Sequence, residues 1–292
     1  MPAWQVTIKV IDWNEAAADL ANYSDEDLAN LGDTGSTPVP PGNTPDPTVN
    51  LEGVNLLDFV AEYNIDITGT KFTTSHTNEA GYTGYFTWEE AMALALTMPA
   101  GYYLPTGYEW RAILGAEWGG HHYIYFNQNK TEKDVALAVQ IPGQTETMDC
   151  VQDYKQVSAE SATYMIRYKD NDTYRSAWRY SWVDGPITGQ KVLKIEAVPV
   201  KTDLTIEQLN KEYFANPKVR KYVKTIYLPA TGYDYNKDGS GSGSQRGSDG
   251  DYWSSKEDIR NVYYGNFNST GALVNLGDCE TNRFAVRPFR NL

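Results

Sequence analysis

Residues 251–292, DYWSSKEDIRNVYYGNFNSTGALVNLGDCETNRFAVRPFRNL, are the stretch that decides the fold. Two anchors, residues 252–255 (YWSS) and 284–287 (FAVR), enclose a segment rich in Asn, Tyr, Ser and Asp. Tyrosine supplies rigid amphipathic contact area, and asparagine and serine supply adaptable hydrogen-bonding groups, as in antibody combining sites. The segment therefore predicts a recognition surface held between buried anchors.

The candidate binding residues lie within that segment. We predict that the ligand-binding residues are Arg260, Asn261, Tyr263, Tyr264, Asn266, Asn268, Asn275, Asp278 and Asn282. Any one of these residues could instead be a solvent-exposed turn residue without a binding role, but the cluster as a whole favours contact with a ligand. The large anchors Trp110, Trp253, Phe284 and Val286 are predicted to be core. Arg287 and Arg290 are expected to pair within the scaffold.

Composition limits the possible partners. The chain has 292 residues and a formal net charge of −13, so it lacks the cationic surface that drives nucleic-acid binding. A basic membrane-surface patch and an apolar run long enough to span a bilayer are both absent from the sequence. The start, MPAWQVTIKV, reads as a fragment boundary, so the lack of a leader says nothing about secretion.

The N-terminal part has a different pattern from the rest. Residues 4–11 alternate like a half-buried strand, and residues 16–28 are compatible with a helix. Residues 32–50 are rich in Pro, Gly and Thr, which is typical of a semi-rigid linker. We therefore expect a strand-and-helix remnant at 1–31, a linker at 32–50 and one large domain at 51–292.

Within the large domain, few helices and many short strands are expected. Residues 85–96 form an amphipathic pattern with a capping box at Thr87 and Glu90, and Thr106 and Glu109 form a second capping box. Short strands are expected at 102–105 and 226–229, and strands and turns dominate 135–200. A third helix is expected to open at 205–208 and to end near Ala215. This pattern is typical of an α+β domain.

Several motifs resemble a known family. Residues 103–106 (YLPT) followed by Glu109-Trp110 resemble the strand-to-helix entry of the C-type-lectin-like fold in its formylglycine-generating-enzyme branch. Residues 228–233 (LPATGY), 251–255 (DYWSS), 263–264, 267–268 and 286–287 are similar to the major paralogous domain of bacterial surface proteins. A similar order of C-terminal motifs occurs in variable proteins of diversity-generating retroelements, in which asparagine codons are diversified.

This resemblance implies a fold and a function. It covers residues 51–292 and implies short twisted antiparallel strands with a few flanking helices. The N-terminal WQVTIKVIDW is similar to the closing strand of fimbrillin domains. Together these imply a non-catalytic adhesin, extracellular on a bacterial cell surface or pilus tip, that recognises a protein or glycan on another cell. A structural pilus or stalk subunit that engages other pilus subunits is the alternative, and a formylglycine-generating-type enzyme is a further one.

A calcium site is weighed against a plain turn. Asp234, Asn236 and Asp238 match the opening of a calcium loop, D-x-N-x-D-G. The twelfth position is Gln245 rather than a bidentate carboxylate, which favours a polar turn over a calcium ion. A calcium ion supported by Asp249 or Asp251 is the alternative. The EPN, QPD and WND triplets of calcium-dependent sugar binding do not occur in the sequence.

Enzyme motifs are weak. Residues 228–232 spell LPATG, but no apolar span and basic tail follow, so a sortase signal is not expected. Formylglycine-generating catalysis needs a closely spaced C-terminal cysteine pair, whereas Cys279 stands alone in that region. Cys150 and Cys279 allow either a disulfide or two free thiols. We therefore predict no enzymatic activity and no required cofactor.

Overall fold

The computed structural model describes the following residues: 45–79, 81–117, 122–233, 245–255, 262–277 and 282–291. The chain divides into two units, Met1–Asp46 and Pro47–Leu292, and nearly all described residues belong to the second. The expected N-terminal strand and helix, and the linker up to residue 44, lie outside the described residues. Val49 is buried and bridges Val200, so the second unit already includes residues just before position 51.

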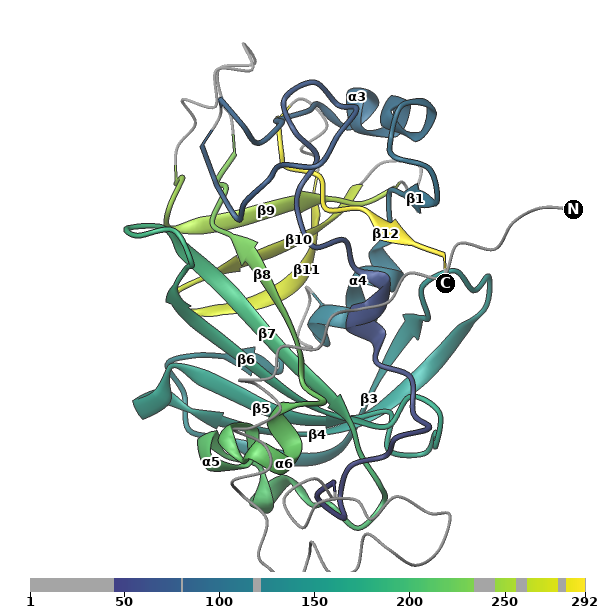
Figure 1. The fold of residues 1–292 in the computed structure, drawn as a ribbon, viewed down its shortest axis with the longest axis vertical. Helices are drawn as coiled ribbons and strands as arrows, with labels where there is room; N and C mark the ends of the chain where they lie inside the picture. Colours follow the sequence, from purple (N-terminus) through teal and green to yellow (C-terminus); the bar gives the residue numbers. More distant parts are fainter. Residues whose placement is uncertain are drawn as a thin grey trace, which may run out of the picture. The chain divides into compact units, whose positions relative to one another are not determined.

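Antiparallel sheets dominate the second unit, and its helices are few and short (Figure 1). The largest sheet has the strand order β3-β4-β5-β6-β7-β8 and is a meander, because neighbours in sequence are neighbours in space. Its strands are β3 (Thr131–Gln140), β4 (Thr147–Val157), β5 (Ala162–Arg167), β6 (Ser176–Asp184), β7 (Lys191–Pro199) and β8 (Lys224–Pro229). The strand-rich pattern expected at 135–200 is therefore confirmed.

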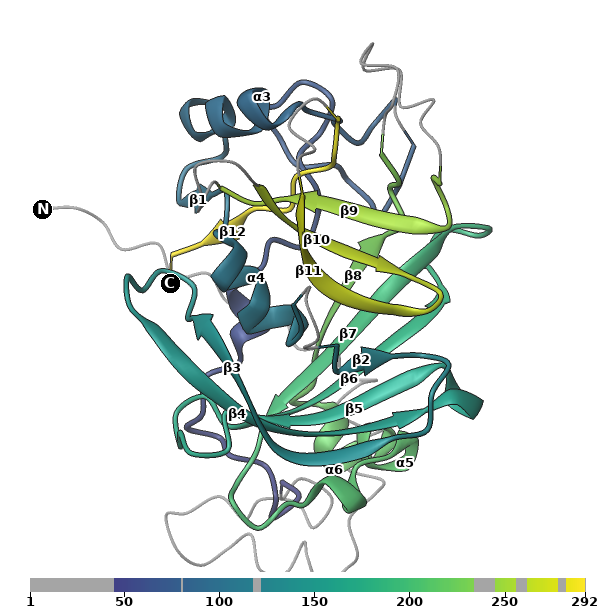
Figure 2. The same cartoon turned by 180° about the vertical axis from the view of Figure 1, so that it is seen from behind.

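A smaller sheet has the order β2-β11-β10-β9 and contains most of the C-terminal segment (Figure 2). Its strands are β2 (Ile124–Tyr125), β9 (Asp249–Trp253), β10 (Val262–Asn268) and β11 (Gly271–Gly277). A third pairing joins β1 (Tyr102–Tyr103) to β12 (Phe289–Arg290), so the end of the chain lies beside the YYLP strand.

Helix α4 (Gly107–Leu114) lies between the two larger sheets (Figures 1 and 2). Its Trp110 and Ile113 are fully buried in one core with Trp178 of the large sheet and Val274 of the small sheet. The predicted capping box is present, since Thr106 accepts from the Glu109 backbone and Glu109 reaches back to Thr106. The helix ends at Gly115, whose φ of +73° is a left-handed conformation that glycine adopts without strain.

A buried arginine fastens α4 to the large sheet. The Arg167 guanidinium is fully buried, and it donates to the backbone oxygens of Arg111 at 2.8 Å and Ala112 at 2.6 Å. These carbonyls belong to the last turn of the helix, where the partial charge is negative and a cation is favoured. The sheet thus supplies the polar cap of the helix that packs on it.

Short helices pack on part of the outer surface of each of the two larger sheets. On the small sheet, α3 (Trp88–Ala93) continues into η3 (Leu94–Leu96), and its Thr87–Glu90 capping box is confirmed. On the large sheet, Phe214 and Val219 pack against Tyr164 and Ile166. The remaining short elements are η2 (Leu56–Phe59), η4 (Ser158–Glu160), η5 (Ile206–Gln208), α5 (Lys211–Ala215) and α6 (Pro217–Arg220).

The prediction of one continuous third helix from 205–208 to Ala215 is wrong. Leu209 is extended, with φ −76° and ψ 126°, so η5 ends there. Asn210 then starts α5 by accepting a hydrogen bond from the Tyr213 backbone. A second asparagine cap, at Asn216 before Pro217, ends α5 and starts α6.

The predicted core anchors are confirmed. Trp110, Trp253 and Val286 are fully buried and Phe284 nearly so. Arg287 is also fully buried, but it binds backbone carbonyls and Asn64 rather than a carboxylate. Among the described residues, no helix combines the length and the apolar character needed to cross a membrane.

Candidate functional site

The small sheet has an inner and an outer face, and they differ in chemistry. On β10, Tyr263, Gly265 and Phe267 face α4 and the shared core. Tyr264, Asn266 and Asn268 alternate with them and face the other way. The cross-strand register adds further polar residues to that outer face. We call Asp249, Asp251, Tyr264, Asn266, Asn268 and Asn275 the outer polar face.

Two asparagine–aspartate pairs connect β10 with β9. The Asn266 side-chain amide donates to Asp251 at 2.8 Å, and the Asn268 amide donates to Asp249 at 3.0 Å. Each pair joins residues that lie directly opposite each other in the ladder. Such cross-strand side-chain pairs fix the rotamers of both partners and stabilise the sheet locally.

Further bonds hold the ends of this row. The Asn268 side-chain oxygen accepts from the Thr270 backbone at 2.8 Å, and the Ser248 hydroxyl donates to Asp249 at 2.9 Å. Asn268 and Asp249 are therefore each oriented by two contacts. A ligand that binds oriented groups loses less conformational entropy than one that must order them.

A tyrosine–asparagine pair extends the face onto β11. The Asn275 amide donates to the Tyr264 hydroxyl at 2.8 Å, and its oxygen accepts from the Leu276 backbone at 2.9 Å. The Tyr264 ring packs against Phe284, with ring centroids 5.0 Å apart. One side of this ring is thus part of the core, while the hydroxyl belongs to the outer polar face, where it accepts from Asn275.

Asp251 is the most perturbed acid of the outer polar face. Its side chain is nearly fully buried, and this burial raises the pKa of the carboxyl group to about 7. The hydrogen bond from Asn266 lowers the pKa and the nearby charge of Asp249 raises it, but burial dominates. Asp251 therefore changes charge near neutral pH, and its protonation affects the acceptor that Asn266 uses.

Tyr263 lies on the opposite face of the sheet from Tyr264, Asn266, Asn268 and Asn275. Its ring is in contact with the start of α4, because a Cβ built on Gly107 would come within 2.5 Å of the Tyr263 Cβ. The Arg111 guanidinium lies 5.0 Å from the Tyr263 ring centroid and 4.1 Å from that of Tyr108. Tyr263 is therefore a half-buried packing residue as well as a candidate contact.

The structure brings four of the predicted residues onto one face, namely Tyr264, Asn266, Asn268 and Asn275. Asn282 is partly exposed and precedes Arg283, which pairs with Glu90 on α3 at 2.6 Å. The predicted residues Arg260, Asn261 and Asp278 lie outside the described part of the chain.

Asp249 and Asp251 were not among the predicted ligand-binding residues and were considered only as supports of a calcium ion. Their signal was present as the period-two pattern Asp249-x-Asp251-x-Trp253, which places all three side chains on one side of β9. The pattern alone could not show which asparagines lie opposite, since this depends on the register.

The predicted calcium ligands Asp234, Asn236 and Asp238 lie outside the described residues. Within the described ranges, no group of three or more His, Cys, Asp or Glu side chains is placed to hold a metal ion. Asp249 and Asp251 use oxygens to accept from asparagine amides, so they already have protein partners.

Cys150 is a free thiol and is fully buried in the core on β4. Burial raises the pKa of this thiol, which disfavours the reactive thiolate. Cys150 thus behaves as a small core residue, and Cys279 lies outside the described part of the chain.

The described unit is an antiparallel β-rich domain with one preorganised polar sheet face. Residues 52–289 match the family described as Domain of unknown function (DUF8237), and the chain belongs to this family. No curated protein and no solved structure matches the chain.

Proposed function

We propose that this chain is a ligand-binding adhesin domain with a C-type-lectin-like fold, displayed on a bacterial cell surface or pilus. Its ligand is a protein or glycan on another cell, and binding is non-catalytic. The observation that carries the proposal is the outer polar face, on which hydrogen bonds with neighbouring side chains orient Tyr264 and three asparagines.

Two contacts support the lectin-like reading. The Trp110 indole donates to the Trp253 backbone oxygen at 3.1 Å, which joins the LPT-x-x-EW motif to the DYWSS motif. The pairing of β1 with β12 brings the first of these motifs beside the end of the chain. Under this proposal the six-stranded sheet is a large addition, inserted in the sequence between α4 and the C-terminal sheet.

The binding mechanism follows from the chemistry of the face. The partly exposed Tyr264 supplies an aromatic contact beside the core, and the amide groups of Asn266, Asn268 and Asn275 supply directional hydrogen bonds. Because these side chains are already ordered, their contacts cost little entropy on binding. Affinity then comes from the aromatic anchor and specificity from the polar groups.

The alternation of the asparagines supports a link to diversity-generating retroelements. Asn266 and Asn268 face outward, whereas the neighbouring Gly265 and Phe267 face the core. Substitution of the outward positions would change the surface and leave the packing intact. Comparison of sibling sequences tests this: variation confined to the outward positions supports it, and equal variation at Trp253 contradicts it.

The first test is a binding screen with the folded full chain. We expect binding to a discrete ligand class on an array of glycans and host surface proteins, in buffer with calcium and in buffer with chelator. Loss of binding in chelator would assign a ligand role to the Asp234 loop. A folded protein that binds nothing on a broad array would count against the adhesin.

A structural pilus or stalk subunit is the second candidate, and one observation favours it. Large apolar side chains on and beside α3 are exposed, with Leu96 91% exposed and Ile67 52% exposed. Exposed apolar residues of this kind are frequent at protein interfaces. Sedimentation analysis distinguishes the candidates, since this alternative predicts self-association that Leu96→Ser weakens.

A further inference from the structure

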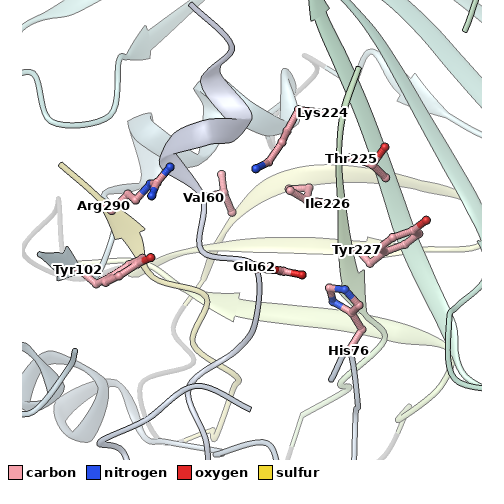
Figure 3. Close-up of a pocket in the computed structure, with 9 residues that line it drawn as sticks. All are labelled: Val60, Glu62, His76, Tyr102, Lys224, Thr225, Ile226, Tyr227 and Arg290. Atoms are coloured by element: carbon pink, nitrogen blue, oxygen red, sulfur yellow. The ribbon is translucent and has the colours of Figure 1, made fainter. Parts of the chain in front are cut away.

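A cavity lies away from the outer polar face. It has a volume of about 340 Å³ and opens between the segment 60–62, β8 and the β1–β12 pair (Figure 3). Its polar and aromatic lining comprises Glu62, His76, Tyr102, Lys224, Tyr227 and Arg290. None of these residues belongs to the outer polar face. The volume lies in the range of small-molecule sites rather than of extended peptide grooves.

A buried arginine holds the two walls of this cavity in place. The Arg287 guanidinium donates to the Ala61 oxygen at 2.9 Å on one wall and to the Tyr227 oxygen at 2.9 Å on β8. Its Nε donates to the Asn64 side chain at 2.8 Å. Because Arg287 is fully buried and bound on both sides, the cavity is formed before any ligand enters.

One wall offers backbone hydrogen-bonding groups. β8 is the edge strand of the large sheet, and the bond from the Ala230 N–H to the Lys191 oxygen sets which backbone groups point toward β7. By the alternation of an antiparallel ladder, the backbone groups of Thr225 and Tyr227 point away from β7 and toward the cavity. Among the described residues, no backbone partner is found for the Thr225 N–H and C=O or for the Tyr227 N–H.

The cavity also offers two cations, Arg290 from β12 and Lys224 from the start of β8. The Arg290 Nε donates a hydrogen bond of 2.7 Å to the backbone oxygen of Asp58, which fixes the guanidinium. In the described part of the chain, no partner is found for the two terminal nitrogens of Arg290. Lys224 lies 3.5 Å from the Asp58 carboxylate, a loose pair in which both side chains are largely exposed. A fixed guanidinium with free terminal nitrogens matches a carboxylate in two-pronged geometry.

The balance of positive and negative side chains around the cavity favours a ligand with one negative charge over a ligand with two. Three cations, Arg287, Lys224 and Arg290, and two carboxylates, Asp58 and Glu62, lie at or beside the cavity. The site therefore accommodates one negative charge better than the two of a phosphate monoester. In Figure 3 the cations Lys224 and Arg290 lie in the upper part and Glu62 and His76 in the lower part. In the lower part the Glu62 carboxylate is a hydrogen-bond acceptor, which suits a hydroxyl donor on the ligand.

His76 contributes an aromatic wall without a charge. Its ring packs between Tyr63 and Tyr227, with centroid distances of 4.8 Å and 5.1 Å. Burial and the nearby Arg287 lower the pKa of His76 to about 4, so the ring is neutral at physiological pH. Tyr102 and Tyr227 add rings against which the apolar face of a sugar can pack.

We propose that this cavity binds an acidic monosaccharide of the hexuronate class. The sugar carboxylate pairs with Arg290 and is attracted by Lys224, and the hydroxyl groups bond to the Thr225 backbone and the Glu62 carboxylate. The inference does not depend on the proposed function, since no residue of the outer polar face takes part.

The test is titration of the full chain with glucuronate and with glucose, followed by isotope-edited NMR. We expect weak but saturable glucuronate binding with shifts at Thr225 and Tyr227, and glucose binding at least about tenfold weaker, as loss of a charged contact predicts. Arg290→Gln should reduce glucuronate affinity to the glucose level, and Lys224→Gln should reduce it by about threefold. Lys201→Gln, an exposed lysine outside the cavity, should have no effect.

Several results of these titrations would overturn the hexuronate proposal. Equal binding of glucuronate and glucose, or glucuronate binding that survives Arg290→Gln, would overturn the proposal. Preferential binding of free amino acids or inorganic phosphate would also overturn it, because the ligand class would be wrong. Thermal melting shows whether Arg290→Gln is folded. If it is not, Lys224→Gln decides, since this exposed side chain can change without loss of packing.

Discussion

The side-chain amide of Asn266 on β10 donates a 2.8 Å hydrogen bond to the carboxyl group of Asp251, which lies directly opposite on β9. This pair joins a buried acid to a partly exposed amide of the candidate binding face. The chemistry of the surface is therefore coupled to an ionisation in the sheet beneath it.

Asp251 predicts a pH dependence of stability. The pKa of its carboxyl group rises from 3.8 to about 7 on folding, so between these pH values the folded protein binds a proton that the unfolded chain has lost. The free energy of unfolding should therefore fall as pH rises from about 4 to 7, by about 1.4 kcal/mol for each pH unit within that window, and then level off. Denaturant unfolding at several pH values measures this.

The matched variants for this effect are Asp251→Asn and Asp172→Asn. The amide introduced by Asp251→Asn keeps an oxygen that accepts from Asn266 and carries no charge. This variant should therefore be more stable than the parent at pH 8 and lack the decrease between pH 4 and 7. Asp172 is exposed, and its substitution should leave the profile unchanged. Parallel profiles of the parent and Asp251→Asn through this window would contradict the burial of Asp251, because the difference between them isolates this carboxyl group from the other acids.

Tyr264 should respond differently to two substitutions. Tyr264→Phe keeps the ring against Phe284 and removes only the hydroxyl that accepts from Asn275, so stability should change by about 1 kcal/mol or less. Tyr264→Ala also removes the ring and should cost about 3 kcal/mol. Thermal and denaturant melts check this, and equal costs for both would show that the ring does not pack in solution.

Gly107 should tolerate no side chain. Alanine normally favours a helix over glycine by about 1 kcal/mol, but a Cβ at position 107 would approach the Tyr263 Cβ to 2.5 Å. Gly107→Ala should therefore destabilise the domain, by about 1–3 kcal/mol as in other overpacked sites. Gly81→Ala is the control, because its Cβ would meet nothing within 4 Å. A stabilised Gly107→Ala would contradict the packing of β10 on α4.

Trp110 should be sensitive even to a conservative change. Trp110→Phe removes the donor to the Trp253 oxygen and part of a fully buried ring, and should cost about 2–4 kcal/mol. Trp88→Phe, at a partly buried indole, should cost less. Chemical denaturation compares the two, and a smaller cost at Trp110 would contradict its central place in the core.

Local signals predicted the helix starts well. The capping boxes at Thr87–Glu90 and Thr106–Glu109 are both formed, because each depends on residues three positions apart. The third helix was mispredicted because Asn210 and Asn216 act as new caps and divide it. Helix-compatible composition did not reveal these restarts.

Long-range contacts were beyond the sequence. Arg287 was expected to form an ion pair, yet it binds the carbonyl oxygen of Ala61, which is 226 residues away. Likewise, the composition of the C-terminal segment predicted a recognition surface, but only the register shows that Asp249 and Asp251 complete the outer polar face and that Tyr263 faces α4. A single sequence shows which side chains alternate along a strand, but it does not show which residues lie opposite them on the neighbouring strand.

The most direct test of the central claim is binding of the Asn266→Ala/Asn268→Ala double variant to the same array of glycans and host surface proteins. Our account predicts that the ligands bound by the parent lose at least about tenfold in affinity, while Asn129→Ala, at an exposed asparagine in the loop before β3, binds as the parent does. Parent-like binding by a folded double variant would contradict the assignment of the outer polar face as the recognition site.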